Sequence, residues 1–408
     1  MSTTTPHTQT AYKDTPIGKI PADWEVTDIN SLGEVYSGGT PDTNNDSYWN
    51  GKINWCTPTD ITKLDGSKYI GETIAKITEE GLKNSSAKLL PIGSLIVCTR
   101  ATIGKAAIST VEISTNQGFK NIVPDQKKAN VEYLYYLITN SENRLLKLGN
   151  GSTFLEISKN DFEKFKIPLP PLSEQKRIAE VLSTWDQAIQ LTEQLIRQKE
   201  QRKKWLMQQL LTGKKRLFSS DDLGDISYEL QKVKLGEYAL IKKGKSLTSS
   251  ELIEGNIPVI AGGKSSPYKH NAYNHENVIT VSASGAYAGF VAYHKGKIWA
   301  SDCSVVAEIK GKSIINYLYY LLTFNQDKIY KLQTGGAQPH VYPDDIHSLS
   351  LIIHKSIKEQ TAIAEVLQTA DKEIELLKAK SEQLKEQKKG LMQQLLTGRK
   401  RLKIEIKV

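Results

Sequence analysis

The sequence has little of what builds disulfide frameworks, zinc sites or membrane spans. Its three cysteines, Cys56, Cys98 and Cys303, are an odd number and lack the paired spacing of a metal site. This usage is typical of a reducing compartment and predicts a cytoplasmic protein without a metal centre. The start of the chain, Ser2–Thr5, is polar and unlike a signal peptide, and no apolar run approaches the roughly 20 residues that cross a bilayer.

Signatures of catalysis are also missing. Gly-Lys-Ser occurs at Gly244, Gly263 and Gly311, but the earlier glycine that a phosphate-binding loop requires is absent each time. The fragment Glu308–Lys310 resembles part of a nuclease site without its upstream Pro-Asp. Three histidines are spaced by sevens, yet a proline interrupts them, so we interpret them as surface or hydrogen-bonded groups: His340, His347 and His354. The sequence therefore predicts a non-catalytic protein.

What is present is a long internal repeat. Ile178–Leu182 returns as Ile363–Leu367, and Leu206–Gly213 returns as Leu391–Gly398. Both blocks are displaced by the same step along the chain (178 to 363 and 206 to 391), so no residue is gained or lost between them. A period this long indicates two large copies of one unit, because solenoid repeats are much shorter.

Each repeated stretch predicts a helix with a coiled-coil seam, because apolar residues recur at alternating steps of four and three. The first helix is expected over residues 173–211, about 58 Å at 1.5 Å per residue. Lys203 and Lys388 interrupt the seam at equivalent places, and Gly213 and Gly398 are plausible C-caps. The predicted seam and partner-docking residues are Ile178, Leu182, Trp185, Ile189, Leu206, Leu210, Ile363, Leu367, Ile374, Leu377, Leu391 and Leu395.

Such a seam could join two chains, but the connectivity favours pairing within one chain. The first helix leaves one globular head and arrives at the second head, from which the second helix starts. We therefore predict an α+β protein: two mainly β heads, separated by two long antiparallel coiled-coil helices with internal pseudo-two-fold symmetry. The predicted divisions are a first head with a disordered polar leader, a first helix, a second head, and a second helix with a basic tail: residues 1–172, 173–217, 218–356 and 357–408.

The heads repeat more loosely than the helices. Short apolar runs separated by turn residues predict strands in residues 32–125, followed by a helix over Glu132–Leu148. Tyr133–Leu137 returns as Tyr317–Leu321, now displaced by one position fewer than the helices (133 to 317), whereas the intervening loops diverge. The net charge of +9 gathers on the helices and their ends, which suggests phosphate contacts or an acidic partner, although solvated helix ends explain any single cluster equally well.

Loops rich in glycine, threonine, amides, cations and aromatics are candidates for contact with phosphates and base edges. Arg100 suits guanine, and the amides of Asn116 and Gln117 suit adenine. Each residue could instead be an ordinary turn or packing residue. The candidates in the first head are Gly38, Gly39, Thr40, Tyr48, Trp49, Thr99, Arg100, Thr102, Gly104, Lys105, Asn116 and Gln117. Those in the second head are Lys245, Gly263, Lys264, Tyr268, Lys269, Ser284 and Tyr287.

The order head, helix, head, helix resembles the specificity subunit of type I restriction–modification systems. The segments that carry the resemblance are Ile17–Trp24, Gly38–Pro41, Thr99–Lys105, Thr115–Phe119, Ile167–Gln175, Leu206–Gly213 and Ile257–Gly263. The second connector, Ile353–Ile357, departs from the Pro-Leu-Pro-Pro pattern of Pro168–Pro171, which predicts a looser second joint.

The resemblance implies a DNA-specificity subunit with two target-recognition domains, each reading half of a split site in double-stranded DNA. The helices would set the gap and dock two modification (methyltransferase) subunits, which need S-adenosylmethionine. Two restriction (motor) subunits, which use ATP and magnesium, would complete the complex, while this chain itself holds no cofactor and contacts no membrane. The alternatives are a coiled-coil adaptor whose heads bind no DNA, and a stand-alone nuclease.

Overall fold

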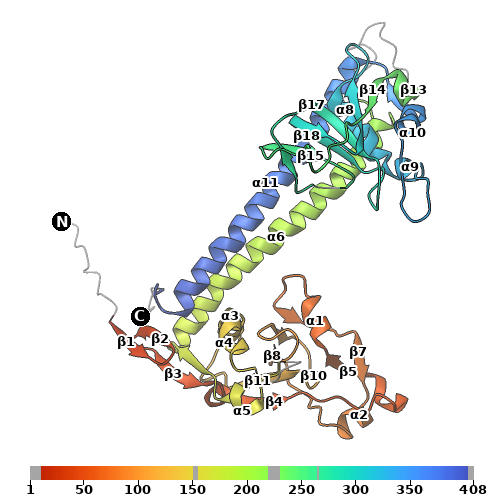
Figure 1. Ribbon diagram of the computed structural model, residues 1–408. Coiled ribbons are helices and arrows are strands. Elements are labelled where there is room, and N and C mark those ends of the chain that lie inside the picture. The colour runs from red at the N-terminus through yellow and green to blue at the C-terminus, as the bar shows by residue number, and fades with distance from the viewer. Residues whose placement is uncertain (1–10, 150–154, 219–229, 264–265, 403–408) are drawn as a thin grey trace, which may run out of the picture. The chain divides into compact units, whose positions relative to one another are not determined.

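The computed structural model describes residues 11–149, 155–218, 230–263 and 266–402 (Figure 1). The predicted disordered leader falls almost wholly outside these ranges. The chain divides into two compact units: Met1–Glu193 with Lys380–Val408, and Gln194–Ala379. Each unit therefore combines one head with parts of both long helices.

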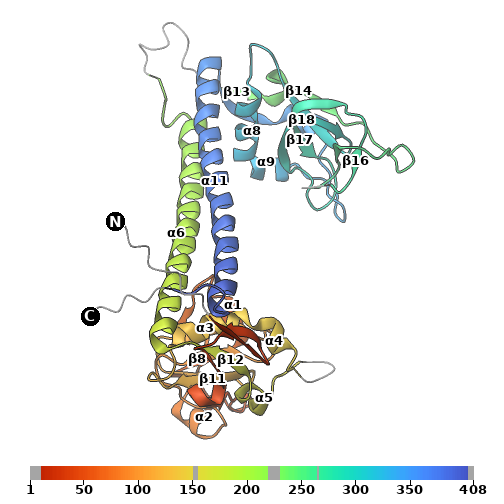
Figure 2. The same cartoon turned by 90° about the vertical axis from the view of Figure 1, so that its left-hand side faces the viewer.

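The two long helices, α6 (Leu172–Leu211) and α11 (Ile357–Leu396), confirm the predicted repeat, and α6 begins one residue earlier than expected. Every predicted seam residue is buried or partly buried. Ion pairs join α6 to α11 within each unit, and the partner numbers on α11 fall as those on α6 rise, so the helices run antiparallel (Figure 2): Asp186–Lys388, Glu193–Lys385, Lys199–Glu373, Glu200–Lys378 and Lys203–Asp371. The seam thus joins helices of one chain.

The first head is built from short helices and many short strands. Its helices are α1 (Pro58–Thr62), α2 (Glu79–Lys83), α3 (Val131–Asn140), α4 (Glu142–Leu146) and α5 (Lys159–Glu163), with 3-10 turns η1 (Ile29–Leu32) and η2 (Asp46–Tyr48). Its strands are β1 (Tyr12–Thr15), β2 (Gly18–Pro21), β3 (Glu25–Asp28), β4 (Gly33–Ser37), β5 (Trp49–Cys56), β6 (Tyr69–Ile70), β7 (Ala75–Ile77), β8 (Leu95–Cys98), β9 (Ala106–Ser109), β10 (Ile113–Thr115), β11 (Phe119–Pro124) and β12 (Lys166–Leu169).

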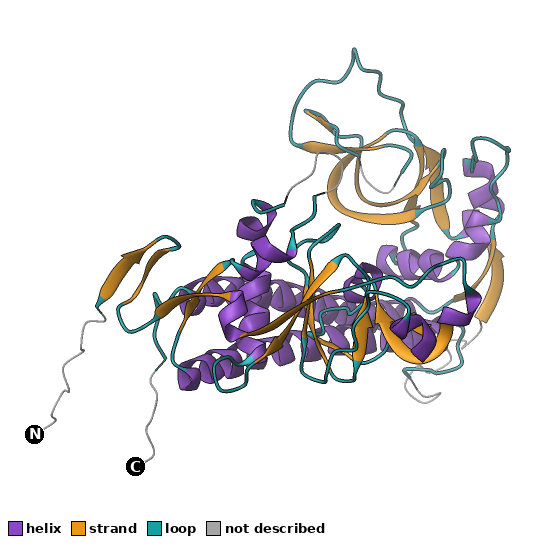
Figure 3. Ribbon diagram, turned by 90° about the horizontal axis from the view of Figure 1, so that it is seen from below, coloured by secondary structure: helices purple, strands orange, loops and turns teal. Residues whose placement is uncertain are grey.

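The second head follows the same order of elements. Its helices are α8 (Ile315–Phe324), α9 (Gln326–Tyr330) and α10 (Pro343–Ser348), with the 3-10 turn η3 (Leu235–Glu237). Its strands are β13 (Leu230–Lys234), β14 (Ala239–Lys243), β15 (Ile257–Ile260), β16 (Lys269–His270), β17 (His275–Ser282), β18 (Val291–Ala300), β19 (Cys303–Glu308) and β20 (Ser350–His354). Both heads are mainly β in their first part, as expected (Figure 3).

The sheets of the two heads correspond strand by strand. The first head has a sheet in the order β4-β11-β8-β9-β6, beside a separate sheet β10-β5-β7. The second head has one sheet, β14-β19-β17-β18-β15-β16. The difference arises because β18 is one long strand where the first head breaks between β9 and β10. β15 pairs in parallel with the end of β18, as β5 does with β10.

The single helix predicted over Glu132–Leu148 is wrong: α3 ends at Asn140, and α4 begins at Glu142. The second head breaks at the equivalent point, between α8 and α9. There the side chain of Asn325 donates to the carbonyl oxygen of Leu321 at 2.8 Å. A short polar side chain that bonds its own backbone offers an alternative to continuing the helix, which a pattern of apolar residues does not detect.

Each unit has one main core, to which both long helices contribute. In the first unit the core includes Ile178 and Leu182 of α6 and Leu395 of α11. In the second it includes Leu210 of α6 and the pair Ile363 and Leu367 of α11. All six side chains are at most 1% exposed. Full burial of one such side chain stabilises a fold by about 1.5–3 kcal/mol, so these residues hold each head to the helices.

The start of each long helix is fixed by a buried glutamine. Gln175 accepts from the backbone N–H of Asn130 at 2.9 Å and donates to the carbonyl oxygen of Pro170 at 2.9 Å. Gln360 makes the equivalent bonds, accepting from Ile314 at 3.1 Å and donating to the carbonyl of His354 at 2.8 Å. Each glutamine thereby connects its head to the connector strand that precedes the long helix.

A second set of contacts repeats further along the helices. Tyr136 of α3 donates to Asp186 of α6 at 2.5 Å, and Lys388 of α11 forms an ion pair with the same aspartate. In the second unit Tyr320 of α8 donates to Asp371 of α11 at 2.7 Å, and Lys203 of α6 lies 2.5 Å from that carboxylate. The lysines that interrupt the seam are therefore paired, and each aspartate joins three helices.

Both connectors are strands despite the missing prolines of the second one. β12 pairs with β3, and β20 pairs with β13, so His354 takes the place that Leu169 has in the first unit. His354 is 2% exposed, and its Nδ1 lies 3.0 Å from the hydroxyl of Tyr317. Its Nε2 lies 3.8 Å from Glu359. Burial, with a smaller contribution from Arg216, lowers the pKa of His354 to about 4.

We expect His354 to make the second unit sensitive to acid. The unfolded chain binds a proton near pH 6.5, whereas the folded chain does so only near 4, so stability is complete above about pH 6.5 and is lost as the pH falls toward 4. The loss is on the order of 3 kcal/mol. His354→Leu, which copies the first connector, should flatten this acid limb in thermal unfolding at pH 4–8. Equal slopes in both proteins would contradict the assignment.

Candidate nucleic-acid interface

Three of the predicted loops of the first head converge at one place. Gly38 donates its backbone N–H to Phe119 at 3.2 Å, and Thr99 donates to Gly118 at 2.8 Å. A fourth segment joins them, because Ile157 donates to Thr99 at 3.0 Å. We call residues 38–41, 99–105, 115–118 and 156–157 the first apex.

The centre of the first apex is a charged cluster. Arg100 Nη1 lies 3.8 Å from Glu156 Oε2, and Lys120 Nζ lies 3.4 Å from Glu156 Oε1. Arg100 and Glu156 are each 39% exposed, whereas Lys120 is buried. Gly118 leaves room for this arrangement, since a Cβ there would lie 3.6 Å from Cβ of Arg100. The arginine is thus held at the surface by a partly hydrated carboxylate.

Several predicted residues shape the first apex from inside. A Cβ on Gly38 would lie 1.8 Å from the carbonyl oxygen of Asn116, and the indole of Trp55 donates to the carbonyl of Gly39 at 2.9 Å. Thr99 is fully buried. These groups fix the loops, so contact with DNA is left to the more exposed side chains: Thr40, Arg100, Thr102, Lys105 and Gln117. Thr40 donates to Gln117, and Gly104 adopts a φ of +86° at the end of the central loop.

Tyr48 and Trp49 lie beside the first apex, at the start of β5. The indole of Trp49 donates to the carbonyl of Asp42 at 3.0 Å and packs edge-on against Trp55, with ring centroids 5.0 Å apart. Because Trp55 holds the loop at Gly39, Trp49 supports the apex indirectly.

The second head has an equivalent apex with the same backbone bonds. We call residues 244–247, 282–290, 301–302 and 334–342 the second apex. The matched hydrogen bonds, first apex before second, are Gly38 to Phe119 and Gly244 to Cys303; Thr99 to Gly118 and Ala283 to Asp302; Ile157 to Thr99 and Val341 to Ala283; and Gly104 to Cys98 and Gly289 to Ser282. Isolated bridges match as well, Arg100 with Glu156 and Ser284 with His340.

The side chains of the second apex are different. Ser284 donates to Asp302, and a Cβ on Gly262 would lie 2.8 Å from Oγ of Ser284, which shows how closely that glycine approaches. Gly263 donates its backbone N–H to Ser282 at 3.0 Å. Lys245 stands where the first head has Gly39, and the indole of Trp299 donates to its carbonyl at 3.0 Å.

The remaining predicted residues of the second head are mostly exposed. Tyr268 and Tyr287 are 57% and 45% exposed, and Lys269 is exposed on β16. Lys264 lies outside the described residues. Tyr342, which the sequence did not single out, is 55% exposed, and its ring stacks on that of His340 at 6.0 Å.

Sequence reasoning missed Glu156, Asp302 and the position of His340. The signal was available, because the displacement that relates Tyr133 to Tyr317 also relates Gly118 to Asp302, and Glu156 to His340. The correspondence is hard to see in the sequence because the loops around these positions share no residues.

Groups that support other chemistry are inert or absent within the described ranges. The three cysteines are buried and unpaired, and burial raises the pKa of Cys98 to about 11 and of Cys303 to about 12, so neither is a thiolate at neutral pH. In the part of the chain that the structure describes, no three His, Cys, Asp or Glu side chains gather as a metal site. No helix among those residues has the length and apolar character needed to cross a membrane.

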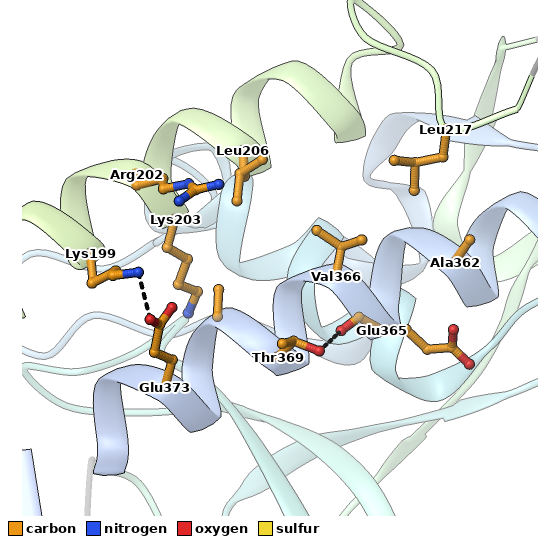
Figure 4. A pocket seen from close by; sticks show the side chains of 11 residues that line it. Lys199, Arg202, Lys203, Leu206, Leu217, Ala362, Glu365, Val366, Thr369 and Glu373 are labelled. Carbon is orange, nitrogen blue, oxygen red and sulfur yellow. Dashed lines mark hydrogen bonds and ion pairs between the residues drawn. The ribbon is translucent and has the colours of Figure 1, made fainter. Parts of the chain in front are cut away.

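The helix surface differs from the predicted docking set. The buried seam residues hold the helices and heads together, and large apolar side chains that face solvent lie elsewhere. Leu191 of α6 and Leu376 of α11 are 66% and 62% exposed and occupy the same place in the repeat. In the second unit a groove of about 510 Å³ lies between α6 and α11, with Leu206 and Val366 among its lining residues (Figure 4).

Comparison with known proteins identifies the family. The model of the "Type I restriction modification DNA specificity domain" matches residues 21–201 and 228–386. The MjaIX specificity subunit of Methanocaldococcus jannaschii is 41% identical over 184 residues, which covers 45% of this chain but only 42% of that protein. The MjaVIII specificity subunit of the same organism is 26% identical over 417 residues, covering 94% of this chain and 95% of that one.

A solved structure shares the fold. The crystal structure of a type I restriction–modification S subunit from M. genitalium has a TM-score of 0.60 at 18% identity, over 91% of this chain and 96% of that chain. The family matches cover both heads and favour DNA recognition over the adaptor and nuclease alternatives. The chain belongs to the specificity subunits of type I restriction–modification systems, the non-catalytic components that recognise DNA.

Proposed function

We propose that the chain recognises a bipartite, asymmetric site in double-stranded DNA, with one half-site bound at each apex. The observation that supports this most is the pairing of identical backbone frames with different side chains. Four matched backbone bonds hold both apices, yet Arg100 and Glu156 in one correspond to Ser284 and His340 in the other. Hydrogen bonds from side chains to base edges decide sequence preference, so two such surfaces suit two different half-sites.

The long helices would act as the spacer between the half-sites. α6 is continuous over 40 residues, which corresponds to about 60 Å at 1.5 Å per residue. One turn of duplex measures roughly 34–36 Å, so a helix of this length suits half-sites within about two turns. The seam, the ion pairs between α6 and α11, and the shared cores would keep the spacer rigid.

The exposed faces of the helices would dock two modification subunits. The repeat places Leu191 and Leu376 at equivalent positions, and both are exposed. A single apolar side chain on a charged helix is weak evidence, but the same residue exposed at both positions suits a partner that binds twice. Those subunits would use S-adenosylmethionine, and two restriction subunits, with ATP and magnesium, would complete a cytoplasmic complex.

DNA binding should be sequence-specific and sensitive to salt. In gel shifts with the modification subunit present, affinity for the preferred duplex should fall at least about 10-fold between 50 and 200 mM salt, because phosphate contacts release counterions. A randomised duplex of equal length is the control. Equal binding of both duplexes at every salt concentration would refute specific recognition.

The gap between half-sites should follow the length of the helix. Four residues inserted after Glu193 add one turn, roughly 6 Å, and coiled coils absorb such an insertion by local unwinding. The tolerated gap should grow by one or two base pairs in selection from randomised duplexes. The same four residues inserted at the exposed turn of Ile92 and Gly93 should leave it unchanged. A gap that ignores the helical insertion would eliminate the spacer role.

Docking should depend on the two exposed leucines. Leu191→Glu with Leu376→Glu should reduce the affinity for modification subunits at least about 10-fold, because a buried charge replaces an apolar contact. Ile74→Glu, at a side chain of the first head that is 66% exposed, is the matched control. Co-purification and size-exclusion chromatography measure the stoichiometry. Unchanged assembly of the double variant would move the docking surface elsewhere.

A further inference from the structure

We infer that three matched positions in each apex select the base that each head prefers: Arg100, Gly118 and Glu156 in the first head, and Ser284, Asp302 and His340 in the second. The first set favours guanine, and the second favours cytosine. This inference rests on the proposed recognition of DNA by the apices and assigns bases to it.

The positions correspond in space as well as in sequence. Arg100 and Ser284 each follow a residue whose N–H bonds to the strand-entry loop, at Gly118 in one head and Asp302 in the other. Each also forms an antiparallel bridge, to Glu156 and His340 respectively. A single displacement along the chain relates all three positions (100 to 284, 118 to 302, 156 to 340). The backbone is thus shared, and only side chains distinguish the two centres.

The side chains in each set fit one another in size. In the first head a long arginine lies over a glycine, and a Cβ added to that glycine would lie 3.6 Å from Arg100. In the second head a short serine leaves room for Asp302, and its hydroxyl donates to that carboxylate. An aspartate at position 118 would press against Arg100, so the three residues form sets that are exchanged together rather than singly.

The first set presents hydrogen-bond donors. Arg100 is 39% exposed and only 3.8 Å from Glu156, a long ion pair that costs little to separate. Glu156 keeps Lys120 at 3.4 Å as a second partner when the arginine turns to DNA. A guanidinium matches the two acceptors O6 and N7 of guanine in the major groove.

The second set presents acceptors. An ionised aspartate accepts hydrogen bonds only, and Ser284 already directs its hydroxyl at Asp302. In the major groove a carboxylate suits the N4 amino group of cytosine and disfavours the two acceptors of guanine. His340, stacked on the exposed ring of Tyr342, borders this centre with an aromatic face.

The test uses the chain assembled with its modification subunits and a randomised duplex library. Arg100→Ser, Gly118→Asp and Glu156→His together transplant the second set into the first head. One position of the first half-site should change from guanine to cytosine, by about 10- to 100-fold, and the second half-site should stay unchanged. Asp302→Asn, which keeps the shape and adds donors, should reduce the cytosine preference of the second half-site about 10-fold or more.

Lys105→Ala is the matched control, because it removes a cation of the same loop that is suited to phosphate contact. It should weaken binding to all sequences about equally. Unchanged preferences in the Asp302→Asn protein, or a triple variant that binds with the original first half-site, would overturn the assignment of bases. A wild-type complex that selects no sequence at all would instead refute the proposed function, so the two failures are distinguishable. If the triple variant does not assemble, Asp302→Asn alone decides.

Discussion

The structure depends on one repeated contact, an aspartate shared by a tyrosine and a lysine. Asp186 receives Tyr136 from the head and Lys388 from the opposite helix, and Asp371 receives Tyr320 and Lys203 in the same way. Charge-assisted hydrogen bonds of this kind are worth about 1.5–3 kcal/mol each when partly buried. Because the aspartate joins three helices, the head helix cannot rotate on the long helices without separating a charge from its partners.

That constraint leaves the apices free to differ. The contacts that fix each head lie on the side of the long helices: the aspartates, the buried glutamines Gln175 and Gln360, and the apolar cores. At the apices, the matched backbone bonds hold the loops together, so a side chain can change without losing the frame. Stability and recognition therefore reside in different residues of the same head.

The sequence predicts the parts in which side-chain pattern decides structure. The helices follow from a seam of apolar residues repeated at a constant displacement, and the strands from short apolar runs between turns. The break at Ser141 and the merging of two sheets at β18 could not be predicted, because local backbone bonds decide both. Glu156 was missed for another reason: it meets Arg100 from a distant part of the chain, through a bridge that leaves no pattern in the sequence.

The two copies also differ in what each surface has kept. On the helices the repeat preserves side chains, down to the exposed leucines Leu191 and Leu376, whose solvent exposure gives the fold no benefit. At the apices it preserves the backbone and none of the three central side chains. A surface that meets the same partner twice requires identical side chains, whereas two surfaces that meet different DNA sequences require different ones. The division between preserved and altered positions is therefore what one partner protein and two unlike half-sites would together impose.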